Sequence, residues 1–195
     1  MKTIDTTKAV GCDNIPPKLL KIAGNELSRP FTHIINETIS KSCFPAELKK
    51  AEVSPIFKAK DALLRGNYRP VSILNTISKL MERIYFNDLY TYFDDIFSKY
   101  ISAFRKHYGC QHVLTRLLVD CKAALDRREQ VGLVLVDLSK AFDCIPHPLL
   151  LSKLYNYGLS TNACNLIWSY LSGRMQRVKI GNVKSTGVNI RSSSF

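Results

Sequence analysis

The feature of this sequence that most constrains its fold is the apolar run at 131–136, VGLVLV, which is followed at once by Asp137. A continuous apolar run without polar alternation is typical of a strand that is covered on both faces. Helical patterns flank it at about 109–125 and 148–157, so strands and helices must share one core. We therefore predict an α+β fold with the strand 131–137 at its centre. The residues expected in its core are Leu133, Leu135, Ile167 and Trp168.

Apolar periodicity and turn residues predict the elements around this run. Three- and four-residue spacing predicts helices that begin near Pro16 and at about 26–42, 77–96 and 161–171. Strands are expected at 51–57 and 69–74, and a hairpin at 176–185 that turns at Gly181-Asn182. Pro55 favours an edge position for the first of these strands. Gly158 and Gly173 fit left-handed stops after the last two helices.

The stretch TYFDDIF at 91–97 spells the Tyr-x-Asp-Asp tetrad with which a polymerase hairpin holds metal ions. A helical apolar period runs straight through it, however, and no turn glycine or two-residue alternation flanks it. On a helix, Asp94 and Asp95 point about 100° apart, since ~3.6 residues make one turn. We therefore interpret the two carboxylates as solvated residues at a helix end.

The charge balance points to a polyanionic partner. The chain has 28 Lys and Arg against 16 Asp and Glu, a formal net charge of +12. Such an excess attracts nucleic acid most often, and a basic membrane-surface protein is the main competitor. No strongly amphipathic basic helix and no membrane-length apolar run occurs, so we expect no membrane partner.

Cysteine spacing and the N-terminal residues bear on the compartment. The six cysteines include no Cys-x-x-Cys pair, and the histidines do not complete a zinc spacing. Scattered single cysteines are typical of reduced thiols. The first ten residues, MKTIDTTKAV, lack the apolar core of a signal peptide. We expect an intracellular protein of the cytoplasm or nucleus that is not secreted.

Asp137 is the strongest candidate for chemistry, because a strand would present its carboxylate rigidly at the sheet edge where α/β folds bind ligands. Mg²⁺ suits such a group, since it takes one or two carboxylates together with substrate phosphates. The alternative is that Asp137 caps a helix beginning near Ser139. Spacing alone leaves both roles open.

The segment DLSKAFDCIPHPLLLSKL at 137–154 resembles the first metal-binding motif of reverse transcriptases from non-LTR, LINE-type retrotransposons. NYRPVSILNTISKLMERI at 67–84 is similar to the fingers motif of that family, and SAFRKHYGCQHVLTRLL at 102–118 to the segment after it. YLSGRMQRVKIG at 170–181 resembles the segment after the metal motif, and GCDNIPPKLLK at 11–21 the lead-in. The matches occur in the family's order and cover most of residues 11–185.

The resemblance implies a role for six residues. Asp137 matches the carboxylate that holds both metal ions, and the carbonyl of Leu138 matches a backbone ligand. Phe142 matches the aromatic residue that excludes a ribose 2′-hydroxyl. Arg69 matches the arginine that grips the incoming triphosphate, a task suited to a planar guanidinium with a fixed charge. Lys58 or Lys60 would assist from the same finger.

The implied activity is RNA-directed DNA synthesis, and the implied partners are an RNA template, a DNA primer and deoxynucleoside triphosphates. Two Mg²⁺ ions, about 3.5–4 Å apart in such sites, stabilise the attacking and leaving oxygens. Basic residues of the fingers and of the C-terminal hairpin would follow the phosphates of template and primer. The sequence does not indicate an oligomeric state.

Three departures from the family pattern shape the expectation for this polypeptide. The Pro-Gln-Gly core does not follow Gly187-Val188, the second Asp pair is missing, and His107 stands where the family often has glycine. We expect an incomplete right-hand polymerase, with helix-rich fingers and connecting helices at about 11–128, a partial palm at about 129–186 and a divergent tail at 187–195. Negligible activity is expected for it alone, whether it is a truncated copy or a piece of a longer reading frame.

Two other functional classes compete with an enzyme. One is a non-catalytic basic module that binds RNA or DNA and derives from a retroelement. The other is a translated remnant that folds poorly, because an incomplete sheet leaves strand edges and apolar faces uncovered. The effect of Asp137→Ala and a cooperative thermal melt separate these alternatives.

Overall fold

The computed structural model describes residues 4–138, 141 and 144–190, which form two compact units. The first unit comprises residues 1–85 and 140–195, and the second comprises residues 86–139. Each unit is described by itself below. Together they contain helices and a small sheet, so the predicted α+β class is confirmed.

The helices of the first unit begin and end close to the residues that apolar periodicity predicted. Pro16 and Pro17 open the first of them, where a missing N–H and a fixed φ cost nothing. Ser160 caps the last, and its Oγ accepts a hydrogen bond from the N–H of Ala163 at 3.2 Å. These helices are α1 (Pro17–Ile22), α2 (Gly24–Ser40), α3 (Thr76–Phe93, which continues into the second unit), α5 (His147–Asn156) and α6 (Thr161–Leu171).

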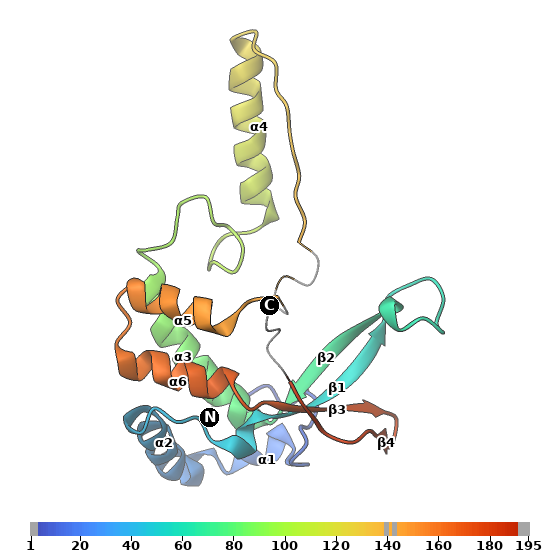
Figure 1. Cartoon of the computed structure of the whole chain (residues 1–195), viewed down its shortest axis with the longest axis vertical. Helices are drawn as coiled ribbons and strands as arrows, with labels where there is room; N and C mark the ends of the chain where they lie inside the picture. The colour runs from blue at the N-terminus through green and yellow to red at the C-terminus, as the bar shows by residue number, and fades with distance from the viewer. Residues whose placement is uncertain (1–3, 139–140, 142–143, 191–195) are drawn as a thin grey trace. The chain divides into compact units, whose positions relative to one another are not determined.

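The core of the first unit lies where α2, α3 and α6 come together (Figure 1). Phe44, which is 1% exposed, packs edge-on against Tyr170 and Tyr85 with ring centroids 5.1 and 6.4 Å apart. Its N–H donates to Ser169 Oγ at 2.9 Å. The Tyr170 hydroxyl donates to Glu82 on α3 at 2.9 Å, and burial together with this carboxylate raises the pKa of Tyr170 to about 12. A hydroxyl and two aromatic edges thus fix α6 against α3.

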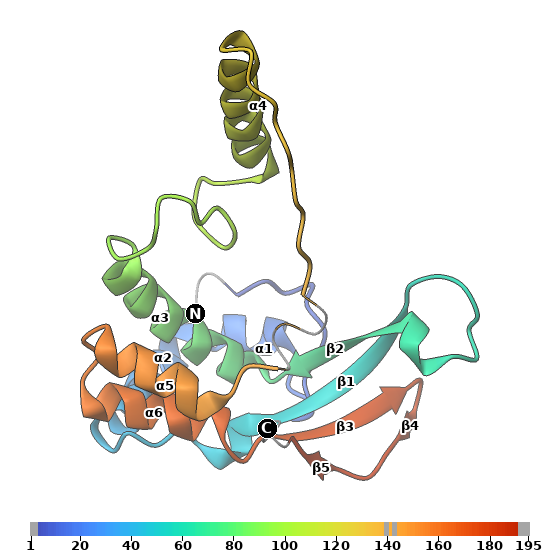
Figure 2. The ribbon, with the colours of Figure 1, turned by 45° about the horizontal axis from the view of Figure 1, so that its top comes forward.

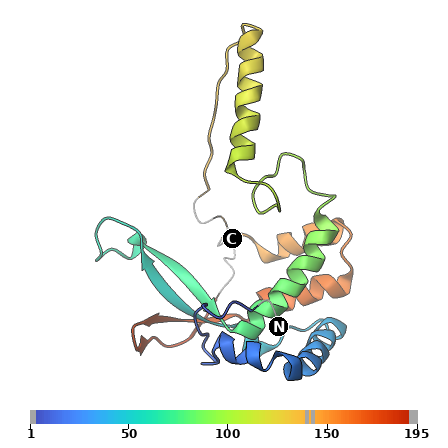
Figure 3. The ribbon, with the colours of Figure 1, turned by 180° about the vertical axis from the view of Figure 1, so that it is seen from behind.

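The sheet of the first unit has the order β2-β1-β3-β4, with β5 also paired to β3 (Figure 2). β1 pairs antiparallel with β2 from Ala51 to Phe57 (Figure 3) but parallel with β3 only over residues 50–53. Beyond Val53, β1 pairs with β2 alone, so Pro55 lies at an edge of the sheet as predicted. Residues 50–53 of β1 lie between β2 and β3 and are not at an edge. The strands are β1 (Lys50–Phe57), β2 (Tyr68–Leu74), β3 (Met175–Ile180), β4 (Val183–Lys184) and β5 (Val188–Asn189).

Turns and close backbone contacts fix the ends of these elements. Gly158, Gly173 and Gly181 have φ values of 95°, 63° and 59°, as the predicted helix stops and hairpin turn require. Gly11 is required for a different reason, namely close packing. A Cβ at this position would lie 2.6–2.9 Å from Asn75 Oδ1, Cα and N. The short strand β5 lies within the divergent tail at 187–195, for which the sequence predicts no strand.

The second unit shows why TYFDDIF is not a metal-binding hairpin. α3 ends at Phe93, and the Asp94 N–H still donates to the Tyr90 carbonyl at 2.9 Å. Asp94 then pairs with Arg105 at 3.2 Å, which closes the loop between α3 and α4 (Cys110–Asp126). The Arg105 guanidinium also lies over the Tyr108 ring, 4.9 Å from its centroid. The interpretation of this tetrad as residues at a helix end is confirmed.

The predicted central strand at 131–137 is wrong for this structure. Residues 129–138 adopt no regular secondary structure, and Leu133 and Leu135 are 57% and 85% exposed. An extended apolar run becomes a strand only when a neighbour supplies its hydrogen bonds, and no strand in the described part of the chain pairs with it. Trp168, at 44% exposure, is also outside the core, whereas Ile167 is partly buried.

No helix of the described residues is both long enough and apolar enough to cross a bilayer. All six cysteines are free in the structure.

Candidate nucleic-acid interface

The positive charge of the chain belongs to one of its two units. Residues 86–139 carry seven Lys and Arg and seven Asp and Glu, so they are formally neutral. The remaining residues, which make up the first unit, carry 21 Lys and Arg against nine Asp and Glu. The whole formal charge of +12 therefore lies in the unit that contains the sheet.

Within the first unit, the sheet and its connections are the most basic part. Residues 49–74 and 174–190, which include all five strands, carry ten Lys and Arg but only two acidic residues, Glu52 and Asp61. Such a density of one sign creates a field that attracts phosphate groups. The sheet is thus the strongest electrostatic candidate for a polyanion interface.

The hairpin of β1 and β2 brings three of the predicted site residues onto one element (Figure 2). Arg69 lies on β2 opposite Ile56, and Lys58 and Lys60 follow β1 directly. All three are exposed, and none forms an ion pair with any residue in the described part of the chain. Their charges are therefore open to a ligand.

Hydrogen bonds order the backbone of the loop that contains Lys58 and Lys60. The Lys58 N–H donates to the Asn67 carbonyl at 2.8 Å, which continues the β1–β2 ladder by one step. Asp61 Oδ1 accepts from the Leu63 N–H at 2.9 Å, and the Asp61 carbonyl accepts from Asn67 Nδ2 at 2.7 Å. The carboxylate of Asp61, the one acidic residue of the loop, therefore accepts a hydrogen bond from the loop backbone. It forms no ion pair with Lys58 or Lys60.

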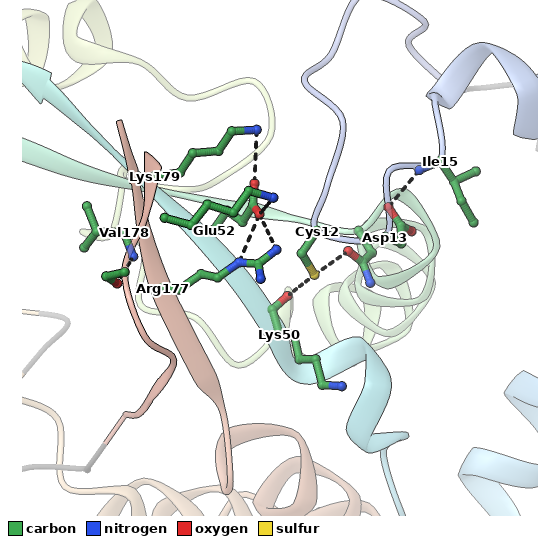
Figure 4. A network of polar contacts seen from close by, with 11 residues as sticks. Cys12, Asp13, Ile15, Lys50, Glu52, Arg177, Val178 and Lys179 are labelled. Atoms are coloured by element: carbon green, nitrogen blue, oxygen red, sulfur yellow. Dashed lines mark hydrogen bonds and ion pairs between the residues drawn. The ribbon is translucent and has the colours of Figure 1, made fainter. Parts of the chain in front are cut away.

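A second basic cluster surrounds Glu52, a residue that the sequence analysis did not single out (Figure 4). Glu52 is 2% exposed, and its carboxylate lies 2.6 Å from Arg177 Nη2, 2.9 Å from Lys184 Nζ and 3.4 Å from Lys179 Nζ. Burial opposes its ionisation, but the hydrogen bonds from Lys184 and Arg177 and the charge of Lys179 outweigh burial and lower its pKa to about 2. Glu52 is therefore an ionised carboxylate beneath three cations.

A cavity of about 430 Å³ lies at the junction of β1 and β3, beside the Glu52 cluster. Lys50 and Arg177 bring charge to its wall, and Ser185 brings a hydroxyl. The Cys12 thiol, also in the wall, donates to Asn75 Oδ1 at 3.1 Å. The basic sheet therefore offers both an exposed hairpin and a recess.

The other three predicted site residues are not on the strands of the first unit or in the loop between β1 and β2. Asp137 and Leu138 belong to the second unit and are exposed, and Phe142 lies outside the described residues. Among residues 4–138, 141 and 144–190, no three His, Cys, Asp or Glu side chains form a group that could hold a metal ion. Asp137 has the right chemistry for Mg²⁺, yet one carboxylate is not a complete two-ion site.

The chain is similar to known polymerases of mobile elements. It is 28% identical over 182 residues to the "RNA-directed DNA polymerase from mobile element jockey" of Drosophila funebris, which covers 92% of this chain. It is also 28% identical, over 93% and 94% of its length, to the probable RNA-directed DNA polymerases from transposon BS and transposon X-element of Drosophila melanogaster. The chain spans about one fifth (20%) of the length of each of these relatives.

Residues 49–191 match the family described as "Reverse transcriptase (RNA-dependent DNA polymerase)". The match includes the whole β1–β2 hairpin, the Glu52 cluster and Asp137, and it covers well over half of the chain. The chain therefore belongs to the reverse transcriptase family.

Proposed function

We propose that this chain supplies the template-, primer- and nucleotide-binding part of an RNA-directed DNA polymerase of a non-LTR retrotransposon. The observation that carries the proposal is the basic sheet of the first unit, on which Lys58, Lys60 and Arg69 are exposed and free of ion pairs with described residues. The relatives named as RNA-directed DNA polymerases align with more than nine-tenths of the chain, which supports the same conclusion.

In this proposal the β1–β2 hairpin is part of the fingers, and Arg69 binds the triphosphate of the incoming nucleotide. A guanidinium can donate two parallel hydrogen bonds to phosphate oxygens, which fixes the orientation of the ligand as well as its charge. Lys58 and Lys60 add point charges from the loop that Asp61 orders. The finger and palm boundaries at about 11–128 and 129–186 and the right-hand architecture belong to the same proposal.

Asp137, the carbonyl of Leu138 and Phe142 are proposed as the metal and sugar contacts of the palm. Mg²⁺, when bound, would stabilise charge on the reacting phosphate oxygens. Asp137 is exposed and could offer a hard oxygen ligand, but the described residues contain no group of three His, Cys, Asp or Glu side chains that could hold a metal ion. We therefore assign no chemical step to the 195-residue polypeptide alone and propose negligible polymerase activity for it. An intracellular location is part of the proposal.

The test of the nucleotide role compares two exposed arginines of the first unit. Arg69→Gln should weaken the binding of a Mg²⁺–deoxynucleoside triphosphate about 10- to 100-fold, since a charge-assisted hydrogen bond contributes roughly 1.5–3 kcal/mol. Arg29→Gln, which removes the same charge from α2, should leave the affinity unchanged. Equilibrium dialysis with a labelled nucleotide measures both. Equal affinities for the two variants would contradict the role of Arg69.

A non-catalytic module that binds RNA or DNA is the second candidate, and the same basic sheet favours it. Both candidates predict that the affinity for a primer–template falls steeply with salt, because bound cations on nucleic acid are released. They differ in the triphosphate test, since a simple binding module gives no difference between Arg69→Gln and Arg29→Gln. Absence of salt-dependent binding to a primer–template by the unmodified protein would exclude both.

A further inference from the structure

One buried carboxylate, that of Glu52, forms ion pairs with three cations from a distant part of the chain. Arg177 donates to Glu52 Oε1 through Nε at 3.1 Å and through Nη2 at 2.6 Å, and Lys184 Nζ lies 2.9 Å from the same oxygen. Lys179 Nζ lies 3.4 Å from Oε2, on the other side of the carboxylate (Figure 4). Both oxygens of Glu52 are therefore occupied by cations of the β3–β4 hairpin.

Strand register explains why these side chains meet. Glu52 of β1 pairs with Arg177 of β3, so the two side chains leave the sheet on the same face. Lys179 is two residues further along β3 and projects from that face too, and it pairs with Lys184 across the β3–β4 hairpin. Three cations thus stand on one face as a consequence of period-two alternation.

The charge of this cluster does not balance. One cation would neutralise Glu52, and three leave a formal surplus of two positive charges. No Asp or Glu occurs between residues 174 and 190 to take up the surplus. The side chains of Arg177, Lys179 and Lys184 are 35%, 39% and 33% exposed, whereas that of Glu52 is 2% exposed. Solvent, or a ligand, therefore reaches the cations from outside while the carboxylate stays beneath them.

We propose that Arg177, Lys179 and Lys184, gathered by Glu52, form a contact site for the phosphodiester backbone of a single-stranded nucleic acid. Glu52 is a positioning residue in this site, because it holds the cations without touching the ligand. Phosphate oxygens accept charge-assisted hydrogen bonds from guanidinium and ammonium groups, and a second anion relieves the repulsion among three crowded cations. The formal surplus of two positive charges matches two consecutive phosphodiesters, each of which carries one negative charge, so a strand backbone suits the site better than a single phosphodiester. This inference rests on the proposed function and names one of its contact surfaces.

The experiment measures how the affinity for a labelled single-stranded RNA changes with salt. Each phosphate contact that is lost should reduce the slope of log K against log salt by about 0.7 for a single strand. The double variant Lys179→Gln/Lys184→Gln should therefore show a slope smaller by about 1.4. The control Lys21→Gln/Lys153→Gln removes two exposed lysines of α1 and α5 and the same net charge, and it should keep the slope of the unmodified protein. Fluorescence anisotropy between about 50 and 200 mM salt covers the useful range.

The outcomes separate this inference from the proposed function. Equal slopes for the two double variants would overturn the contact site and leave general attraction by net charge. Absence of salt-dependent RNA binding by the unmodified protein would instead overturn the proposed function. A third outcome is that the Lys179→Gln/Lys184→Gln variant binds inorganic triphosphate more weakly than the unmodified protein does, while its slope of log K against log salt for RNA is unchanged. In that case the cluster binds nucleotides and the inference is wrong.

Folding of the variants is checked by circular dichroism and a thermal melt. If the double variant does not melt cooperatively, the single variant Lys184→Gln tests the inference, because Lys184 lies on the exposed two-residue strand β4. Its slope should fall by about 0.7 relative to Lys153→Gln, and an unchanged slope would overturn the site. The variant Lys179→Arg/Lys184→Arg keeps both charges and should retain the slope of the unmodified protein.

Discussion

Glu52 and Arg177 are paired neighbours on the parallel strands β1 and β3, although 125 positions separate them in the chain, and the Arg177 guanidinium donates two hydrogen bonds to one oxygen of Glu52. This pair connects the first strand of the sheet to the hairpin formed by β3 and β4. Because Glu52 is buried, its charge contributes to stability only while its partners remain in place.

The first prediction concerns acid stability. The folded-state pKa of Glu52 is about 2, below its ordinary value of 4.5, so ionised Glu52 stabilises the fold fully above about pH 4.5. That contribution is lost as the pH falls from about 4.5 to 2, and it amounts to about 3 kcal/mol. Urea denaturation at a series of pH values should show this loss in the unmodified protein. Glu52→Gln should be less stable at pH 7 and should lose less stability on acidification; an identical pH dependence would contradict the assignment.

A second prediction concerns Gly11. The Cβ of Gly11→Ala would lie 2.7 Å from Asn75 Cα and 2.9 Å from Asn75 N, and backbone atoms at the start of α3 cannot move aside cheaply. We expect a destabilisation of about 2 kcal/mol in the thermal melt of the first unit. Gly66→Ala is the matched control, since nothing lies within 4 Å of its Cβ. A Gly11→Ala variant as stable as Gly66→Ala would show that this contact is not tight in solution.

The loop between α3 and α4 provides a third prediction. His107 has φ 67°, a left-handed conformation in which a side chain costs roughly 1 kcal/mol and glycine costs little. His107→Gly should therefore stabilise the loop and slow amide hydrogen exchange at residues 101–109. Lys106→Gly should do the opposite, because Lys106 does not have a positive φ and the substitution removes its ammonium group, which lies 4.7 Å from the centroid of the Tyr90 ring. Faster exchange in His107→Gly would argue against backbone strain at this position.

The apolar run after α4 provides a fourth prediction. Leu135 and Val134 are each 85% exposed, and an unpaired apolar segment with high strand propensity favours association. Leu135→Lys should leave the melting temperature nearly unchanged and should reduce light scattering at high protein concentration. The control Leu80→Lys places a charge at a buried position of α3 and should destabilise the first unit strongly. A large loss of stability in Leu135→Lys would mean that this segment is packed in solution.

The helices can be predicted from the sequence because their apolar period and end signals are local. The cap at Ser160 and the left-handed Gly158 and Gly173 are each determined by a few neighbouring residues. The strand predicted at 131–137 is absent from the structure, because a local apolar run carries no information about whether a distant segment pairs with it. The fold class and the hairpin at 176–185 needed only alternation and a Gly-Asn turn, and the structure confirms both.

The candidate site was predictable only in part. Lys58, Lys60 and Arg69 are brought onto one hairpin as expected, because two adjacent strands and a loop connect them. The role of Glu52 was missed, since its partners come from a strand 125 residues away. The sequence does contain one indication of such a partner. Arg177 and Lys179 lie on the same face of a strand without acidic residues, which indicates that a carboxylate from another part of the chain balances their charge. The functional roles of Asp137, Leu138 and Phe142 remain predictions.

The parallel pairing of β1 with β3 sets an order for folding. β1 and β2 are joined by a short loop and can form their ladder as soon as both have been synthesised, whereas β3 must wait until residue 175 and beyond have been added. Bringing β3 to β1 closes a loop of more than a hundred residues. This step is slow, because the chain loses entropy before any stabilising contact between the two strands forms. During that interval Glu52 lacks the cations that later cover it, and β1 lacks one neighbour. Until residues 175–178 have been synthesised, a nascent chain can therefore pair β1 with β2 alone.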